Sequence, residues 1–161
     1  MKRLLVPIDF STTTPRVLEF VGSLAKPLAA EVCLIHVKEL PSAIPPNPIG
    51  YGMAGMPELM PTSSMSLAEP VPPSVPNESE KLKLTEWSRD LERQGLKVTS
   101  QEVIGGVVEE ILRIADEMEV DLIVMGRHGH GAMYNLLVGS VTEGVLKHSR
   151  RPVLLVPEFR S

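Results

Sequence analysis

The feature that most constrains the fold is a series of short apolar runs of strand length, which alternate with stretches of helical period. The runs at 4–8, 32–37 and 121–125 are almost continuously apolar. Continuous runs of this length are typical of strands covered on both faces, as in parallel sheets. Residues 97–104 alternate instead, which predicts a more exposed strand, and residues 153–156 give a fifth strand.

Helical patterns lie between these runs, at about 11–28, 77–95, 107–118 and 140–149. Ser11 is expected to cap the first helix, and Pro27 predicts a frayed or kinked end. Asn77 followed by Glu80 resembles a capping pair and predicts the start of the second helix. Alternating strands and helices predict an α/β fold with an open parallel sheet and helices on both faces. The length of 161 residues fits one domain spanning 1–161, and the pattern alone leaves the strand order open.

Residues 126–142 follow the fourth apolar run directly and form a candidate phosphate-binding segment. Gly126, Gly129 and Gly139 followed by Ser140 give the spacing G-x2-G-x9-G-S. Glycine lets the backbone approach a ligand closely, and the unpaired amides and dipole of a helix's first turn favour an anion. The segment lacks the P-loop pattern and the glycine pattern of dinucleotide enzymes. The alternative is that these are ordinary turn glycines and that Ser140 is an N-cap.

This spacing resembles the nucleotide-binding signature of the universal stress protein family. Four further features are similar to that family: a first strand that ends in Asp9, the pair His36-Val37 after the second strand, a strand from Asp121 to Gly126 with an aspartate, an aliphatic run and a glycine, and a proline-bounded last strand at 152–157. The resemblance covers about 1–40 and 78–157. It implies the strand order 3-2-1-4-5, a Rossmann-like sheet in which Asp9 and Gly126 face each other across a crevice. Ligands of open α/β sheets bind at such a switch point.

The resemblance also implies ATP as the ligand and a role for each site residue. Pro7 and Asp9 border the adenine and ribose, and Val37 closes the base pocket. The backbone and hydroxyl donors for phosphate come from the glycine segment, and any Mg²⁺ is held mainly by the phosphates. The expected nucleotide-binding set is Pro7, Asp9, Val37, Met125, Gly126, Arg127, Gly129, Gly139, Ser140, Val141 and Thr142. The alternative for Asp9 is that it only caps the following helix.

The remaining reactive side chains do not predict catalysis or a metal site. His128 and His130 lie two apart on a glycine loop without a nearby cysteine or carboxylate, which is an incomplete ligand set. His36 and His148 are expected to be structural. Cys33 is expected to be a small core residue, because no positive neighbour is evident to activate its thiol. Without a P-loop lysine or a carboxylate for Mg²⁺, fast hydrolysis is not expected.

Residues 41–76 differ from the rest of the chain in composition. Ten of the fifteen prolines and four of the eight methionines lie there, so neither a helix nor a central strand can run through this stretch. Two interpretations remain open. The stretch is a flexible insertion, or its methionines cover a neighbouring subunit or the mouth of the nucleotide site.

Net charge and cysteine content limit the possible partners and the cellular compartment. A net charge of −4 without a basic cluster argues against nucleic acid as a partner. The first apolar run is interrupted by Asp9 too early for a secretory leader, and no stretch reaches the length of a membrane span. A single cysteine allows no internal disulfide, which favours a reduced, cytoplasmic compartment.

Three functions are compatible with these observations. The first is an ATP-binding sensor or regulator in the stress response, the second a slow ATPase or nucleotide-dependent transferase, and the third an interaction module that uses 41–76. A homodimer is also expected, because the last strand, Val153, Leu154, Leu155 and Val156, is an edge strand with an apolar row.

Overall fold

The chain forms a five-stranded parallel sheet in the order β3-β2-β1-β4-β5. The computed structural model describes residues 2–39, 78–127 and 138–157. The strands are β1 Arg3–Pro7, β2 Glu31–Lys38, β3 Lys97–Ile104, β4 Leu122–Gly126 and β5 Val153–Val156. The predicted fold class and strand order are therefore confirmed.

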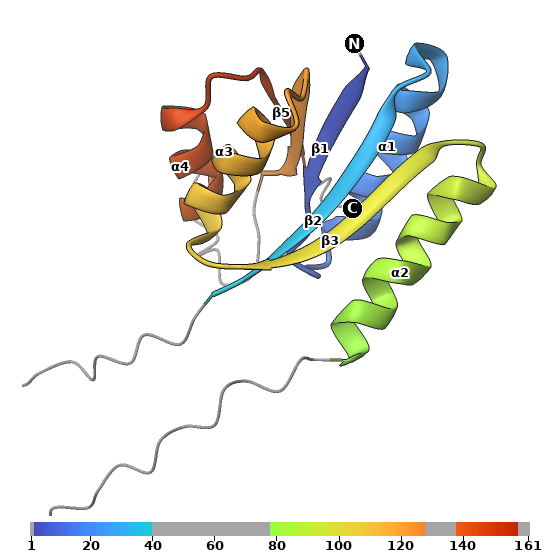
Figure 1. Cartoon of the computed structure of the whole chain (residues 1–161), viewed down its shortest axis with the longest axis horizontal. Coiled ribbons are helices and arrows are strands. Elements are labelled where there is room, and N and C mark those ends of the chain that lie inside the picture. The colour runs from blue at the N-terminus through green and yellow to red at the C-terminus, as the bar shows by residue number, and fades with distance from the viewer. Residues whose placement is uncertain (1, 40–77, 128–137, 158–161) are drawn as a thin grey trace, which may run out of the picture. The chain divides into compact units, whose positions relative to one another are not determined.

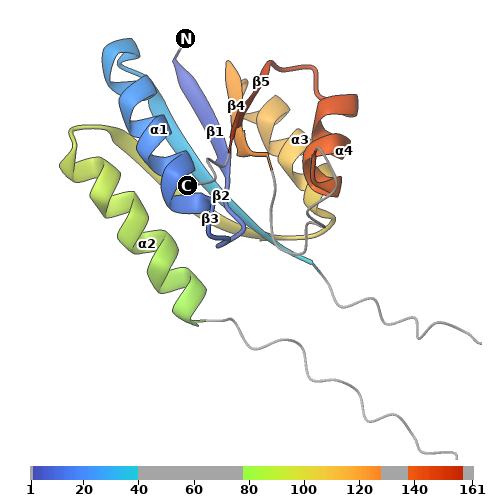
Figure 2. The ribbon, with the colours of Figure 1, turned by 180° about the vertical axis from the view of Figure 1, so that it is seen from behind.

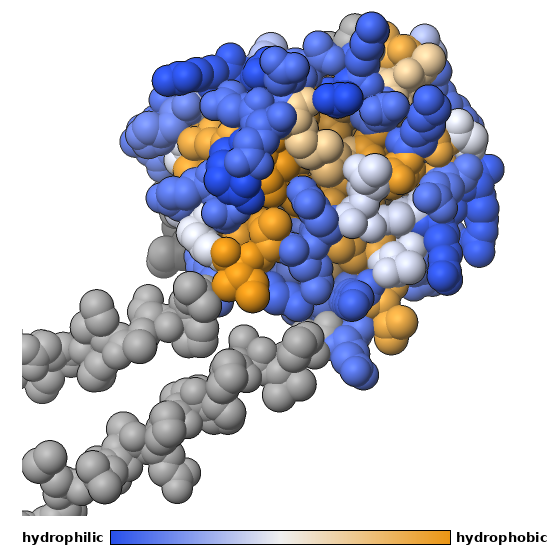
Figure 3. Space-filling view, viewed as in Figure 1, coloured by the Kyte–Doolittle hydropathy of each residue, from blue (hydrophilic) through white to orange (hydrophobic). Residues whose placement is uncertain are grey.

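Two pairs of helices cover the two faces of this sheet. The helices are α1 Thr14–Leu28, α2 Glu78–Arg93, α3 Val107–Glu117 and α4 Ser140–His148. Figures 1 and 2 show α1 and α2 on one face and α3 and α4 on the other. In the view of Figure 3 the surface over α2 is largely hydrophilic, and Lys81, Lys83 and Glu86 are among its exposed residues.

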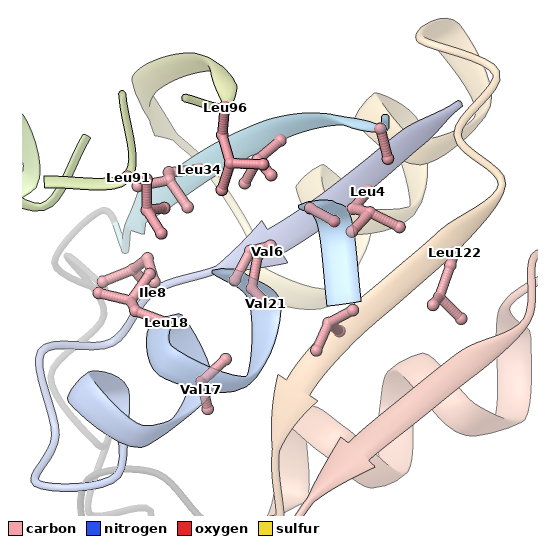
Figure 4. Close-up of a cluster of buried hydrophobic side chains, with 14 of the residues drawn as sticks. Leu4, Val6, Ile8, Val17, Leu18, Val21, Leu34, Leu91, Leu96 and Leu122 are labelled. Carbon is pink, nitrogen blue, oxygen red and sulfur yellow. The ribbon is translucent and has the colours of Figure 1, made fainter. Parts of the chain in front are cut away.

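The alternation of side chains along each strand divides the core into two clusters. Leu4 and Val6 of β1 point into the cluster beneath α1 and α2, which Figure 4 shows. Leu5 points the other way, into the cluster beneath α3 and α4. All three side chains are fully buried. Because both faces need apolar residues, a central strand has the continuous apolar run that the sequence shows.

Strand β3 has the exposed character that its alternation predicts, because it lies at the edge of the sheet. Val98 is half-buried and packs against the α1/α2 cluster, whereas Thr99, Ser100 and Gln101 are exposed. The strand covers the predicted residues, Lys97–Ile104.

The ends of α1 differ from the sequence prediction. The helix begins at Thr14 with Thr13 as the N-cap, so the assignment of Ser11 as the cap is wrong. The reason is that Ser11 belongs to a turn before the helix, in which its amide donates to Asp9 and its carbonyl accepts from the Thr14 amide. At the other end, the helix runs through Pro27 to Leu28 without fraying, and Ala29, with φ of 47°, closes it in the left-handed conformation.

The remaining expectations for the helices are met within one or two residues. Asn77 lies outside the described residues, and α2 begins at the next residue. Residues 41–76 also lie outside them. No helix within 2–39, 78–127 or 138–157 has the length and apolar character that a bilayer crossing requires.

Candidate functional site

The carboxyl ends of β1 and β4 form the point at which the chain changes direction across the sheet. These strands are hydrogen-bonded neighbours, with Leu4 opposite Leu122 and Leu5 opposite Ile123. From β1 the chain continues through α1 to β2, and from β4 through α4 to β5, on the opposite face and toward the opposite edge. In open α/β sheets this switch point is where ligands bind.

Asp9 lies on the β1 side of the switch point, two residues beyond the half-buried Pro7 that ends the strand. One carboxylate oxygen, Oδ1, accepts hydrogen bonds from the Ser11 amide at 3.0 Å and from the Thr14 hydroxyl at 3.1 Å. The carboxylate therefore organises the turn that precedes α1, and neither of these two bonds comes from a backbone amide of the helix. Its side chain is nevertheless exposed at the end of the sheet. This placement is compatible with the ribose or adenine contact as well.

On the β4 side, the chain before and after residues 128–137 is joined by hydrogen bonds. The Gly139 amide donates to the Arg127 carbonyl at 3.1 Å, and the Arg127 amide donates to the Val156 carbonyl of β5 at 3.1 Å. The Thr142 hydroxyl, which is buried, donates to the Gly126 carbonyl at 3.2 Å. These bonds fix the first turn of α4 beside the end of β4.

The same bonds show which predicted phosphate donors are already engaged within the protein. The Gly139 amide and the Thr142 hydroxyl both have internal acceptors. The backbone amides of Ser140, Val141 and Thr142 form the first turn of α4, where a helix offers no carbonyl four residues earlier. The N-cap residue is Gly139, which has no side chain that could accept from these amides, and Ser140 is exposed. The amide donors of the helix are thus better placed for an anion than the hydroxyl of Thr142.

One acidic side chain lies close to these amides. Glu143 is in the first turn of α4, and its carboxylate pairs with Lys147 at 2.7 Å, one turn further along the helix. The hydrogen bond from Lys147 lowers the pKa of Glu143. Its negative charge is therefore balanced within the helix.

Two of the predicted site residues are core residues in this structure. Val37 near the end of β2 and Met125 of β4 are both buried in the cluster beneath α3 and α4. Arg127, directly after β4, is exposed. Gly129, His128 and His130 lie outside the described residues. The described residues contain no group of three histidine, cysteine or acidic side chains that could hold a metal ion.

Sequence reasoning missed a cluster beside Asp9. Phe10 contacts the rings of His36 and Trp87, with centroids 4.6 and 5.4 Å away. His36 was expected to be structural, and nothing in the pattern indicated Phe10. The three residues are far apart in the sequence, so no local signal could have joined them.

These residues define a class of structure, the open, doubly wound α/β sheet. At its switch point the first turn of α4 provides backbone amides. The profile of the universal stress protein family matches residues 1–53 and 56–157. The chain belongs to this family. The match includes most of 41–76, so it is wider than the resemblance that the motifs supported.

Individual relatives agree with this assignment. The chain is 34% identical to universal stress protein MJ0577 of Methanocaldococcus jannaschii over 168 residues, which covers 99% of this chain and 97% of the relative. The solved structure of MJ0577 superposes with a TM-score of 0.67 at 30% identity, covering 99% of this chain and 98% of that one.

Two more distant structures share the fold and contain nucleotides. A universal stress protein in complex with cAMP has a TM-score of 0.65 at 20% identity and covers 97% of this chain and 96% of its own. A universal stress protein of Archaeoglobus fulgidus in complex with dAMP has a TM-score of 0.62 at 17% identity, with coverage of 96% and 97%.

Proposed function

We propose that this protein binds ATP at the switch point between β1 and β4 and acts as a nucleotide-dependent sensor or regulator in the stress response. The observation that carries the proposal is the first turn of α4, whose amides lie at the end of β4 behind Gly139, an N-cap residue that has no side chain to accept from them. Unpaired amides and the helix dipole favour a phosphate. Adenine nucleotides on two proteins of the same fold support the choice of ligand.

In this proposal the ligand lies across the ends of both strands. Asp9 accepts a hydrogen bond from the ribose or the adenine amino group, with Pro7 and Val37 beside the base. Gly126, Gly129 and the amides of Ser140, Val141 and Thr142 surround the phosphates, and Mg²⁺ is held by phosphate oxygens. Hydrogen bonds to an ionised phosphate are about twice as strong as neutral ones, which allows micromolar binding without a lysine.

The direct test is to identify and titrate the ligand. The freshly purified protein is denatured, the released small molecules are identified by mass spectrometry, and ATP, ADP, AMP and cAMP are titrated by calorimetry. We expect ATP in the released fraction and micromolar affinity. A protein without affinity for any of the four nucleotides contradicts the proposal and favours an interaction module.

A matched pair of substitutions at Ser140 tests where the phosphates bind. Ser140→Asp places a negative charge at the first position of α4, where it suits the helix dipole but repels a phosphate. Ser140→Asn has nearly the same shape without the charge. We expect Ser140→Asp to weaken ATP binding by about tenfold or more, which corresponds to a loss of about 1.4 kcal/mol of binding free energy.

The two controls for this pair are the neutral variant and the thermal stability. Ser140→Asn should bind ATP with an affinity within about twofold of the wild type, which is a change of less than about 1 kcal/mol in binding free energy. Ser140→Asp should melt no lower than Ser140→Asn. Equal ATP affinities for the two variants would place the phosphates elsewhere.

The fate of ATP in the purified protein distinguishes a sensor from an enzyme. Retention of stoichiometric, unhydrolysed ATP over hours with Mg²⁺ supports the sensor. Steady phosphate release that stops in a Gly129→Val variant favours a slow ATPase or transferase.

Two further proposals concern the setting of this function. We propose a cytoplasmic location, supported by the buried thiol of Cys33, the only cysteine, whose pKa burial raises. We also propose a homodimer formed through Val153, Leu154, Leu155 and Val156 of β5.

A further inference from the structure

The loop between β1 and α1, which carries Asp9, contains one residue in an unfavourable conformation. Phe10 has φ of 56°, in the left-handed region that large side chains rarely adopt. Such a conformation persists only where the surroundings hold the residue in place. The contacts of the Phe10 ring therefore indicate what fixes this loop.

Two rings hold the side chain of Phe10. The Trp87 ring of α2 stacks on it with centroids 5.4 Å apart and an interplanar angle of 26°. The His36 ring of β2 meets it edge-on, with centroids 4.6 Å apart and an angle of 64°. Both are favourable aromatic geometries. The free energy that the two contacts contribute together is of the same order as the conformational strain of a left-handed phenylalanine.

His36 itself lies between the end of β1 and the first turn of α2. Its Nδ1 lies 2.8 Å from the Ile8 carbonyl oxygen, and this nitrogen carries the hydrogen because a carbonyl can only accept. Its Nε2 lies 3.8 Å from Glu80 Oε2 in the first turn of α2. The ring that supports Phe10 is thus hydrogen-bonded to the end of β1 and lies beside α2.

Ile8 completes the support on the other side of Asp9. Its amide donates to the Ile35 carbonyl of β2 at 2.7 Å. Its side chain is 4% exposed and lies in the α1/α2 cluster, near Leu18 in Figure 4. Asp9 is the exposed residue between two anchored neighbours, Ile8 and Phe10.

We infer that Phe10, held between His36 and Trp87, is a positioning residue that fixes the Asp9 carboxylate for the ligand. The ring does not itself need to touch the ligand, because its effect passes through the backbone to the adjacent residue. This inference rests on the proposed function of the site. It adds that α2, through Trp87, supports the nucleotide-binding loop.

The test uses three variants of the full chain. Phe10→Leu keeps much of the volume but removes the aromatic contacts, Phe10→Gly also removes the strain of the positive φ, and Phe10→Tyr keeps the ring. Phe20→Leu is the matched control, because it makes the same change on the partly exposed outer side of α1. ATP affinity is measured by calorimetry. Exchange of the Ser11 amide, which donates to Asp9, is measured by NMR without nucleotide.

We expect Phe10→Leu and Phe10→Gly to bind ATP about tenfold more weakly than the wild type and to exchange the Ser11 amide faster. Phe10→Tyr and Phe20→Leu should match the wild type in both measurements. Emission of Trp87, the only tryptophan, should change in the leucine and glycine variants of Phe10.

The glycine variant separates positioning from stability, because glycine adopts this φ without strain. Leucine and glycine variants that bind ATP like the wild type overturn the inference, even if they melt at a lower temperature. A wild-type protein that binds no nucleotide refutes the proposed function instead. Hydrogen exchange of the Ser11 amide then still shows whether the Phe10 ring fixes the loop. An unchanged exchange rate in Phe10→Leu overturns the inference that it does.

Discussion

Asp121 shows how one exposed carboxylate joins two strands at the amino end of the sheet. Its Oδ2 accepts hydrogen bonds from the backbone amides of Lys2 and Arg3. Its own amide donates to the Arg3 carbonyl at 3.0 Å. The hydrogen bond from the Lys2 amide, followed by that from Arg3, lowers the pKa of Asp121. The residue therefore links the starts of β1 and β4, at the end of the sheet away from the proposed site.

This lowered pKa predicts a pH dependence of stability. The folded protein favours the ionised form, so the contribution of Asp121 is present above the unfolded pKa of about 3.9 and is lost as the pH falls through the lower folded value. Asp121→Asn keeps an oxygen that can accept the bonds but removes the charge. We expect the wild type to unfold at a higher urea concentration than the variant at pH 6, and the difference to shrink as the pH falls below about 3.9.

Urea titrations at several pH values measure this difference. Asp90→Asn is a suitable control, because it makes the same change in an exposed carboxylate that pairs with Arg93 within the surface of α2. A constant difference between wild type and Asp121→Asn across the acidic range would show that the ionised form contributes nothing.

At the scale of the elements, the sequence predicts the strands well because each has a local signature. The apolar runs of β2 and β5, and the alternation of β3, place these strands within one residue at either end. The start of α1 was placed wrongly, because Asp9 draws the Ser11 amide into a separate turn. The local pattern of hydroxyl residues cannot show which one caps the helix.

The candidate site was predictable only in outline. The end of β4 and the start of α4 follow from the order of glycines and apolar residues. The bond from the Gly139 amide to Arg127 could not be predicted, since it depends on how the chain returns after residues 128–137. The support of Phe10 by His36 and Trp87 depends on three distant elements meeting, which no local spacing encodes.

Because α3 and α4 approach each other closely, a glycine-to-alanine substitution in α4 is predicted to destabilise the protein, which is the opposite of its usual effect in a helix. Replacing glycine by alanine within a helix generally stabilises it by about 1 kcal/mol. A Cβ on Gly144 of α4, however, would lie 2.8 Å from Val108 Cγ2 of α3. The branched side chain of Val108 cannot rotate away easily. We expect Gly144→Ala to lower the free energy of unfolding by about 1 kcal/mol, since overpacking costs about 1–3 kcal/mol.

Urea denaturation of two further variants checks the cause. Gly22→Ala in α1 is the matched control, because its Cβ would meet only the flexible end of Gln94, at 2.9 Å, and otherwise Leu91 at an ordinary 3.6 Å. This variant should be as stable as the wild type or more so. Adding Val108→Ala should make Gly144→Ala stabilising relative to Val108→Ala alone. If Gly144→Ala and Gly22→Ala have the same effect, close packing of the two helices is not the reason.

At the scale of the whole molecule, the two edges of the sheet differ in character. The outer strand β3 exposes polar side chains, among them Lys97, Thr99 and Ser100. Polar and charged residues are a common protection against pairing at an edge. The other outer strand, β5, carries an uninterrupted apolar row. A second copy of the chain is therefore better accommodated along β5 than along β3.

The backbone of β5 defines which groups are available for such a pairing. The carbonyls of Pro152 and Val156 accept from Ile123 and Arg127 on the β4 side. Since successive residues of a strand direct their backbone groups to opposite sides, Val153 and Leu155 direct theirs away from β4. An antiparallel dimer about a two-fold axis can use these two residues from each copy.

The proposed dimer is tested by two variants that act on it differently. Leu155→Glu places a charge in the apolar row, and Val153→Pro removes one outward amide without removing a bond to β4. We expect the wild type to have twice the chain mass of 17.6 kDa in sizing with light scattering, and both variants to shift toward the monomer. Circular dichroism confirms that each variant is folded, which matters most for Leu155→Glu because Leu155 also packs against the α3/α4 cluster. Leu82→Glu, on the exposed surface of α2, is the control and should remain a dimer. Folded variants that stay dimeric would exclude β5 as the interface, and a monomeric wild type would exclude the dimer itself.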